Sequence, residues 1–130
     1  MKKYQECLLD PEQSAVLIVD HQPQMYFGVE SAARAAIGNS VTGLAKAAKL
    51  FGVPCILTTV EAQVFSGPLY SKVQGIYPQA VPIDRTCINA WEDSALKAAV
   101  QGVKRKKIVI AGLWTEVCVL FPALCMLRDG

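Results

Sequence analysis

Cys118 is the residue with the clearest chemical potential, because it lies where an apolar segment leads into a predicted helix. The run 108–111 predicts a buried strand, and the segment 112–119 that follows it carries the thiol. Thr115 can cap the helix, which places Cys118 at the third helical position, near the positive end of the helix dipole. We therefore expect a thiolate, which attacks carbonyl carbon, although an isolated cysteine near a strand is more often a small core residue.

A carboxylate follows a second apolar run. Residues 15–20 have the pattern of a buried strand that ends in Asp20. A carboxylate beside a thiol can accept its proton and later return it to a leaving amine. Taken alone, Asp20 is more often a strand-end cap or a salt-bridge partner, so its role depends on what lies beside it.

Metal and cofactor chemistry has little support in the sequence. The five cysteines lack the Cys-x-x-Cys spacing of a zinc or redox site, and His21 is the only histidine. We therefore expect no metal site. The glycines do not form the fingerprint that binds dinucleotides, so we expect no cofactor either.

Apolar runs and helical periodicity predict the elements that would position these residues. Strands are expected at 15–20, 54–59 and 107–111, and helices at 39–51, 96–103 and 115–128, with an added turn at 31–37. Asn89 and Glu92 resemble a capping box ahead of the second helix. Residues 66–82 are rich in proline and glycine, which predicts a loop with at most one short helix.

The alternation of strands and helices predicts the fold class. Continuous apolar strands joined by helices are typical of an α/β protein with a mostly parallel sheet between two helical layers. We expect a single domain over residues 1–130. Ligands bind at the carboxyl ends of such strands, so Asp20 and Cys118 are expected to meet there.

Charge and hydropathy argue against several partner classes. The net charge of +2 is too small to indicate nucleic-acid binding, and the basic run 104–107 is typical of a solvated loop. No apolar stretch approaches the roughly 20 residues of a membrane span. The first residues lack a secretory apolar core, so we expect a cytoplasmic protein without membrane contact.

Three separate segments resemble those of the isochorismatase-like cysteine hydrolases, a family that includes nicotinamidases. Residues 15–22 resemble its aspartate segment, 85–91 its basic-residue segment and 111–123 its nucleophile segment. Within the family, the amino-acid sequences of the last two segments are most similar to those of the YcaC-like hydrolases. The resemblance covers nearly the whole chain and implies a Rossmann-like, three-layer α/β/α fold.

The resemblance implies three catalytic residues and a reaction. The nucleophile falls on Cys118, the general acid/base on Asp20, and the third residue on Arg85, where the family usually has lysine. Arginine stays cationic and can hold Asp20, but it does not transfer protons. The cysteine implies hydrolysis of a carbon–nitrogen bond in a small-molecule amide through a thioester. Without the resemblance, Arg85 is more simply a surface charge.

The resemblance also implies an oxyanion hole and a pocket. The family has a non-proline cis peptide before its nucleophile helix, and the matching bond joins Leu113 to Trp114. The backbone N–H groups of Trp114 and Cys118 would stabilise the tetrahedral intermediate. Four residues are interpreted as substrate-binding candidates that line the pocket: Phe27, Glu61, Trp91 and Trp114.

The remaining expectations concern supporting residues and assembly. His21 and Gln22 are expected to orient the Asp20 loop, and Cys87 and Cys125 to be core thiols. Relatives continue beyond the position of Gly130, which indicates that the C-terminal part of the family domain is missing. We expect a homo-oligomer whose neighbouring subunits complete the site. The alternatives are a non-catalytic binding or structural module with an idle thiol, or a thiol with a redox role.

Overall fold

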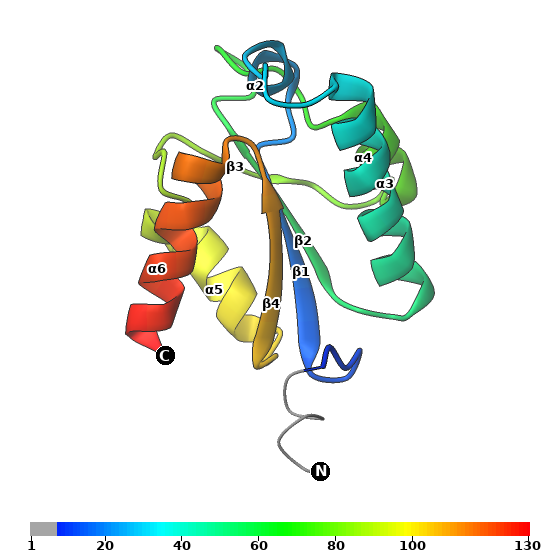
Figure 1. Cartoon of the computed structure of the whole chain (residues 1–130). Helices are drawn as coiled ribbons and strands as arrows, with labels where there is room; N and C mark the ends of the chain where they lie inside the picture. Colours follow the sequence, from blue (N-terminus) through cyan, green and yellow to red (C-terminus); the bar gives the residue numbers. More distant parts are fainter. Residues whose placement is uncertain (1–7) are drawn as a thin grey trace.

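A four-stranded parallel sheet forms the centre of the molecule (Figure 1). The computed structural model describes residues 8–130, so the first seven residues of the predicted domain, Cys7 among them, lie outside the described part. The strands are β1 (Ser14–Val19), β2 (Cys55–Val60), β3 (Ile83–Arg85) and β4 (Lys107–Gly112), in the order β3-β2-β1-β4. Every pairing is parallel. The carboxyl ends of all four strands therefore lie at one edge.

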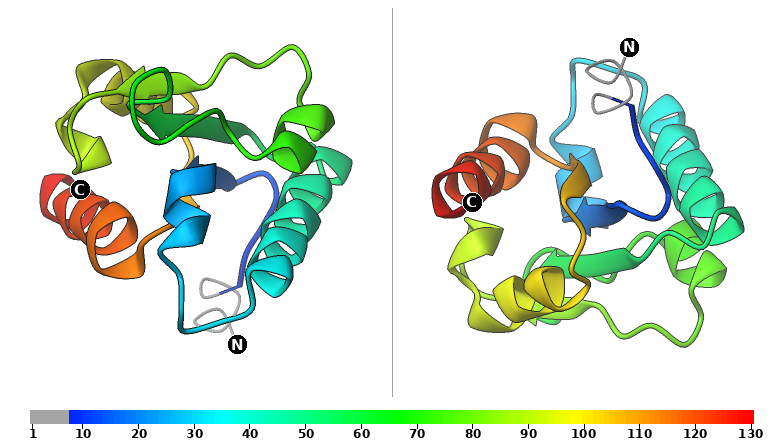
Figure 2. Two further views of the ribbon diagram at one scale, coloured as in Figure 1. Left: turned by 90° about the horizontal axis from the view of Figure 1, so that it is seen from above. Right: turned by 90° about the horizontal axis from the view of Figure 1, so that it is seen from below.

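Helices cover both faces of the sheet, which confirms the predicted three-layer α/β/α fold. They are α2 (Pro23–Phe27), α3 (Arg34–Leu50), α4 (Ser71–Ile76), α5 (Ser94–Gly102) and α6 (Leu120–Asp129). Two short turns complete the set: the 3₁₀ turn η1 (Ala90–Glu92) and the π-helical turn η2 (Thr115–Val119). Figure 2 shows α3 and α4 on one side of the strands and α5 and α6 on the other.

Strand β1 divides the apolar core into two parts because successive side chains of a strand point to opposite faces. Val16 and Ile18 pack with buried residues of α3 and α4, whereas Leu17 and Val19 pack with residues of η1 and α5. All six residues of β1 are buried. Strand β1 is one of the two inner strands, and Asp20 follows it directly.

The structure corrects several predicted boundaries. Helix α3 begins at Arg34, five residues before the predicted start, so the alanine-rich stretch forms its first turns. Strand β3 was not predicted, because three residues after Pro82 are too few to show a period. Strand β4 was predicted to be buried but is half-buried, because it is the edge strand of the described sheet.

Helix caps also differ from the predictions. Asn89 caps the turn η1 by accepting from the Trp91 N–H at 3.2 Å, and Asp93 caps α5 by accepting from the Leu96 N–H at 2.8 Å. Thr115 does not cap a helix, because it is the first residue of η2 and Trp114 holds the cap position. Cys118 therefore lies inside a π-helical turn, two residues before α6.

Candidate active site

Three strand ends bring Asp20, Arg85 and Cys118 together. Asp20 directly follows β1, Arg85 is the last residue of β3, and Cys118 lies in the turn after β4. Their exposed fractions are 0%, 2% and 5%. The residues are separated by 65 and 33 positions in the sequence, and the parallel sheet makes them neighbours because their strands end at one edge.

Arg85 and Asp20 form a fully buried ion pair in which Arg85 Nη2 donates to Asp20 Oδ1. Three other acceptors hold the guanidinium. Nε donates to Thr58 Oγ1 at 3.0 Å, and Nη1 donates to the carbonyls of Cys87 at 2.6 Å and Ile88 at 3.3 Å. A charge that is removed from water needs such partners, and here each guanidinium nitrogen has one.

The backbone around Asp20 is held in the left-handed region, with φ of 56°. Aspartate tolerates this conformation better than most residues. The Asp20 N–H donates to the Thr58 carbonyl at 3.1 Å, and the Asp20 carbonyl accepts from the Gln22 N–H at 2.8 Å. These bonds fix the direction in which the carboxylate leaves the end of β1.

The side chain of Gln22 ties the Asp20 loop to the neighbouring strand. Its amide accepts from the Val60 N–H at 2.9 Å and donates to the carbonyls of Val60 at 3.1 Å and Gly67 at 2.6 Å. His21 Nδ1 lies 2.9 Å from the Tyr26 hydroxyl, and burial lowers the pKa of His21 to about 4. These contacts connect the residues after Asp20 to β2 and α2, and an orienting role for His21 and Gln22 stays a prediction.

The Cys118 thiol contacts the Asp20 carboxyl and is neutral. Burial, the hydrogen-bonding contact with Asp20 and its negative charge together raise the pKa of Cys118 to about 12. Burial also raises the pKa of Asp20, while Arg85 and the thiol oppose that rise. Asp20 Oδ2 makes no hydrogen bond of standard geometry among the described residues. It is therefore available to accept the thiol proton.

The predicted thiolate is wrong for the resting site. That prediction depended on a Thr115-capped helix whose dipole would stabilise the anion, and Thr115 is instead the first residue of a π-helical turn. Burial beside a carboxylate opposes ionisation more strongly than the remaining backbone groups favour it. The sulfur becomes a nucleophile only when Asp20 removes its proton.

The peptide bond between Leu113 and Trp114 is cis, which confirms that prediction. The Trp114 N–H interacts with the Cys118 sulfur and lowers the pKa of the thiol. The Cys118 N–H instead donates to the Trp114 carbonyl at 2.8 Å. Of the two predicted oxyanion-hole donors, therefore, Trp114 faces the sulfur and Cys118 is occupied within its own turn.

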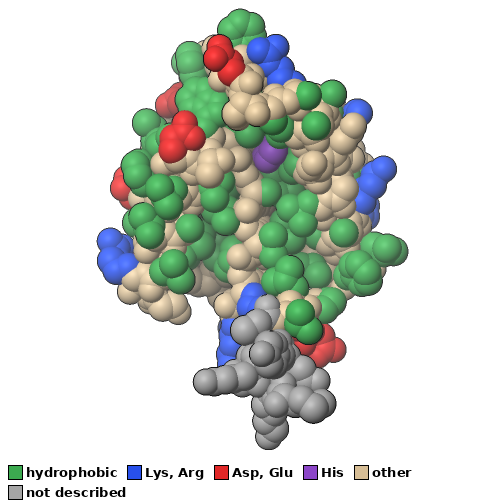
Figure 3. All heavy atoms as spheres, viewed as in Figure 1, with side chains coloured by type: hydrophobic (Ala, Val, Ile, Leu, Met, Phe, Trp, Pro, Cys, Tyr) green, Lys and Arg blue, Asp and Glu red, His purple; other side chains and the backbone are tan. Residues whose placement is uncertain are grey.

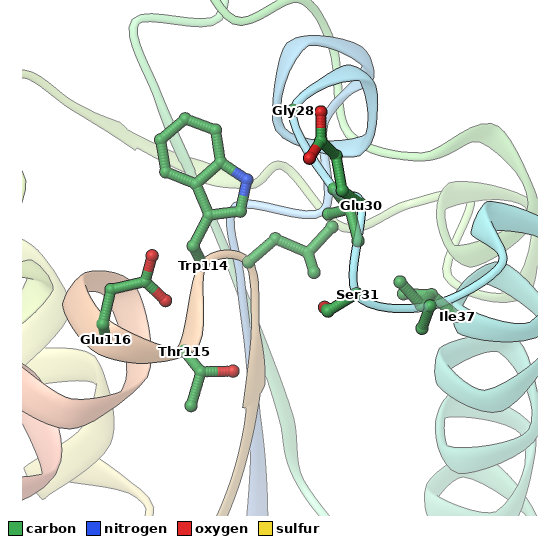
Figure 4. Close-up of a pocket in the computed structure, with 10 residues that line it drawn as sticks. Gly28, Glu30, Ser31, Ile37, Trp114, Thr115 and Glu116 are labelled. Atoms are coloured by element: carbon green, nitrogen blue, oxygen red, sulfur yellow. The ribbon is translucent and has the colours of Figure 1, made fainter.

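An open hollow of about 620 Å³ lies beside the segment that leads to Cys118. Its walls come from the α2–α3 connection, the start of α3 and the end of β4 with η2: Gly28, Val29, Glu30, Ser31, Ala32, Ile37, Leu113, Trp114, Thr115 and Glu116. Figure 4 shows Trp114 with Glu116 on one wall and Glu30 on the other. Asp20, Arg85 and Cys118 do not line it, so Trp114 is the link between the hollow and the thiol.

The other predicted pocket residues lie elsewhere. Phe27 is 72% exposed, and its ring lies under the Arg34 guanidinium at 5.5 Å. Glu61 directly follows β2, and its carbonyl accepts from N–H groups of residues 64–66. Trp91 lies away from this hollow, because its ring packs in the core and its Nε1 donates to Asp129 on α6 at 2.9 Å; a substrate-binding role for it stays a prediction. Asn89, which caps η1, and Trp91, which bonds α6, therefore stabilise the packing of η1 against α6.

Trp114 is positioned by a glycine that sequence reasoning passed over. Its Nε1 donates to the Met25 carbonyl at 3.0 Å, and its ring lies against Gly28. A Cβ on Gly28 would lie 2.7 Å from Trp114 Cζ2, which is closer than real contacts allow. Only glycine leaves room for the ring in this position.

Gly28→Ala is expected to displace the Trp114 indole and to lower the free energy of unfolding by about 1–3 kcal/mol, as overpacking does. The measurements are tryptophan emission in the native state and urea unfolding. Gly43→Ala is the matched control, because a Cβ there meets nothing within 4 Å and alanine is the better helix former. An unchanged emission spectrum in Gly28→Ala would contradict the contact.

No group of metal-ligating side chains occurs within residues 8–130, and none of the helices described there is long and apolar enough to cross a membrane.

Comparison with known proteins identifies the family. The model of the isochorismatase domain matches residues 14–130. The chain belongs to the isochorismatase family. The Probable hydrolase YcaC of Escherichia coli K12 is 38% identical over 123 residues, which cover 94% of this chain and 59% of that protein. The chain thus spans about three fifths of the length of this isochorismatase-family relative.

Solved structures of YcaC proteins share the isochorismatase-family fold described above. The Pseudomonas aeruginosa YcaC structure, described with hexane-2,5-diol and covalent acrylamide, has a TM-score of 0.90 at 39% identity and covers 94% of this chain and 61% of its own. The E. coli YcaC structure, described as an octameric hydrolase of unknown specificity, has a TM-score of 0.91 at 38% identity, with coverage of 95% and 61%. These matches confirm the predicted resemblance to YcaC-like hydrolases.

Proposed function

We propose that this chain is a cysteine hydrolase that cleaves a carbon–nitrogen bond of a small-molecule amide through a thioester. The observation that carries the proposal is the buried contact between the Cys118 thiol and the Asp20 carboxyl, with Arg85 bonded to the same carboxyl. A nucleophile beside a base, with the base oriented by a third group, is the arrangement that covalent catalysis requires.

The first half-reaction forms the thioester. As the Cys118 sulfur attacks the amide carbonyl carbon, its proton passes to Asp20, and the carbonyl oxygen gains the negative charge. The Trp114 N–H, which faces the sulfur, can donate to that oxygen. Asp20 then gives the proton to the amide nitrogen, the carbon–nitrogen bond breaks and the amine leaves.

The second half-reaction releases the acid. Asp20, again a carboxylate, removes a proton from water, and the hydroxide attacks the thioester carbon. The carbon–sulfur bond breaks, the proton returns to sulfur and the neutral thiol is restored. Atoms and charge balance without a metal or an oxidant, so the described side chains are sufficient for the cycle.

Arg85 acts on Asp20 and does not act as a proton carrier. Its guanidinium stays protonated in proteins, so it opposes the rise in the pKa of Asp20 that burial causes. Without that opposing charge, the buried carboxyl would hold a proton and could not accept one from sulfur. This is how we interpret the departure from the family lysine.

The hollow beside Trp114 is the proposed site for the non-reacting part of the substrate. It is open to solvent and is lined by both apolar and polar groups, as small-molecule sites are. Trp114 reaches it with its ring and faces Cys118 with its backbone N–H. We place Trp114 in the substrate pocket on these contacts, and leave Phe27 and Glu61 as predictions.

A non-catalytic module of the same fold is the second candidate. A thiol that is 5% exposed and has a pKa of about 12 is inert unless a base assists it. The chain spans about three fifths of the length of its YcaC relatives. Exposed apolar side chains lie on α6 itself, at Leu120, Phe121, Leu124 and Leu127, and hydrophobic side chains gather over this helix on the face that Figure 3 shows. Assembly with further copies, as described for the E. coli octamer, stays a prediction here.

Acrylamide separates the two candidates. At pH 7 we expect one adduct, located on Cys118 by peptide mass mapping, and none on Cys55, Cys87 or Cys125. Cys118→Ser should remove the adduct, and the control Cys87→Ser should retain it. With Asp20 as base, the alkylation rate levels off well below pH 12, whereas an unassisted thiol gains about tenfold per pH unit up to its pKa.

Turnover is measured on a panel of small amides by release of the amine. Hydrolysis that Cys118→Ser abolishes supports the hydrolase. Equal, slow labelling of all four described cysteines, with no turnover of any amide, would support the non-catalytic module.

A further inference from the structure

We propose that Thr58 is a positioning residue whose side-chain hydroxyl holds the Arg85 guanidinium against Asp20. The inference rests on the proposed function, because it assigns Thr58 a part in keeping Asp20 ready to accept the Cys118 proton. Thr58 lies in the middle of β2, outside the three segments that carried the family resemblance.

The guanidinium is aimed by its other contacts. It is planar, so the positions of Nε and Nη1 determine the direction of Nη2. The carbonyls of Cys87 and Ile88 hold Nη1, and Thr58 Oγ1 holds Nε at 3.0 Å. The carbonyls belong to the connection after β3, whereas Thr58 is the only one of these anchors on a central part of the sheet.

The Thr58 hydroxyl has a defined orientation. It donates to the Ile83 carbonyl at 2.7 Å, so its lone pairs are left for Arg85 Nε. The backbone of Thr58 pairs with Val19 on β1 and with Ile83 on β3. The Thr58 hydroxyl thus fixes the position of the guanidinium relative to strands β1, β2 and β3.

Thr58 also contacts the other partner of the ion pair. Its carbonyl accepts from the Asp20 N–H at 3.1 Å, while its hydroxyl accepts from Arg85. Asp20 and Arg85, the two members of the ion pair, therefore both bond to Thr58, through different groups. Substitution removes the contact with Arg85 and leaves the backbone contact with Asp20 in place.

Thr59 provides a matched control on the same strand. It is also buried, and its hydroxyl donates to Asp84 Oδ1 at 2.8 Å and to neither Arg85 nor Asp20. Threonine and valine have nearly the same shape and both suit strands, so each Thr→Val change removes one hydroxyl with little change in packing volume.

The experiment measures acrylamide alkylation of Cys118 against pH in the full chain. In Thr58→Val, Arg85 loses one anchor and stabilises the Asp20 carboxylate less well. We expect the acidic limb of the rate profile to move up by about one pH unit, so that at a pH on that limb the rate falls about tenfold. Thr58→Ser, which keeps the hydroxyl, should restore the wild-type profile, and Thr59→Val should leave the profile unchanged.

Urea unfolding is measured for all three variants, so that rates are compared only for folded protein. A residue that only stabilises the fold would lower the free energy of unfolding without moving the acidic limb. An unmoved limb in Thr58→Val, an equal shift in Thr59→Val, or failure of Thr58→Ser to restore the profile would each overturn the inference. Failure of the wild-type chain to label at Cys118 would instead overturn the proposed function.

Discussion

Asp20→Asn is expected to slow acrylamide alkylation of Cys118 at pH 7 by about 10²–10⁴-fold, the usual contribution of a general base. Asparagine has nearly the same shape as aspartate but cannot accept the thiol proton. Burial is the largest cause of the raised pKa of Cys118 and remains in the variant, so the unassisted thiol stays mainly protonated at pH 7. The measurement is the second-order alkylation rate from intact-protein mass.

The same substitution is expected to lower the free energy of unfolding by about 3–5 kcal/mol, because it leaves the buried Arg85 charge without its partner. Asp84→Asn is the matched control. Asp84 lies next to Arg85 on β3 but is exposed, and it accepts from Thr59 and the Ala62 N–H. A rate in Asp20→Asn within threefold of the Asp84→Asn rate would contradict the role of Asp20.

Arg85→Met is expected to be nearly as damaging, for the opposite electrostatic reason. Methionine fills much of the volume but leaves Asp20 buried without a cation, so the pKa of Asp20 rises further. The carboxyl then holds a proton at neutral pH, and alkylation of Cys118 at pH 7 should fall about 10²-fold. Arg85→Lys keeps a positive charge and should retain more of the rate, although it cannot satisfy all the acceptors that Arg85 bonds.

The stability of Arg85→Met is expected to fall as the pH rises. In Arg85→Met the folded-state pKa of Asp20 lies above its unfolded value near 3.8. Protonation therefore favours the folded state, and the stability so gained is lost as the pH rises through the folded-state pKa. The unfolding free energy of the variant, relative to wild type, should be about 3 kcal/mol lower at pH 7 and should recover toward pH 4. A constant difference across this range would contradict the buried pairing.

Much of the fold could be predicted from local pattern. The runs at 15–20, 54–59 and 107–111 are apolar because parallel strands are covered on both faces, and each lies within a residue or two of an observed strand. Strand β3 and the start of α3 were missed, since a three-residue strand has no period and alanine-rich sequence has little amphipathic contrast.

The residues of the site were predicted from residue types and from the family resemblance. The protonation state of Cys118 was not predicted correctly. Asp20, Arg85 and Cys118 are identifiable because each lies at or just beyond a strand end in a segment similar to the family's. The neutral thiol was missed because its pKa depends on burial and on the charge of a carboxyl 98 positions away. Thr58 was missed because nothing in its neighbours distinguishes its hydroxyl from that of Thr59.

The sequence by itself determined three of the four described strands, their parallel sheet, and Asp20 and Cys118 at strand ends, because these follow from hydropathy period and side-chain chemistry over short distances. Arg85 came from the resemblance to the family. Tertiary structure alone decided which hydroxyl holds Arg85, which carbonyl occupies the Cys118 N–H, and that Trp91 is a core residue whereas Trp114 lines the hollow. The physical reason is that burial, hydrogen-bond partners and pKa values arise from groups that the fold brings together from distant parts of the chain.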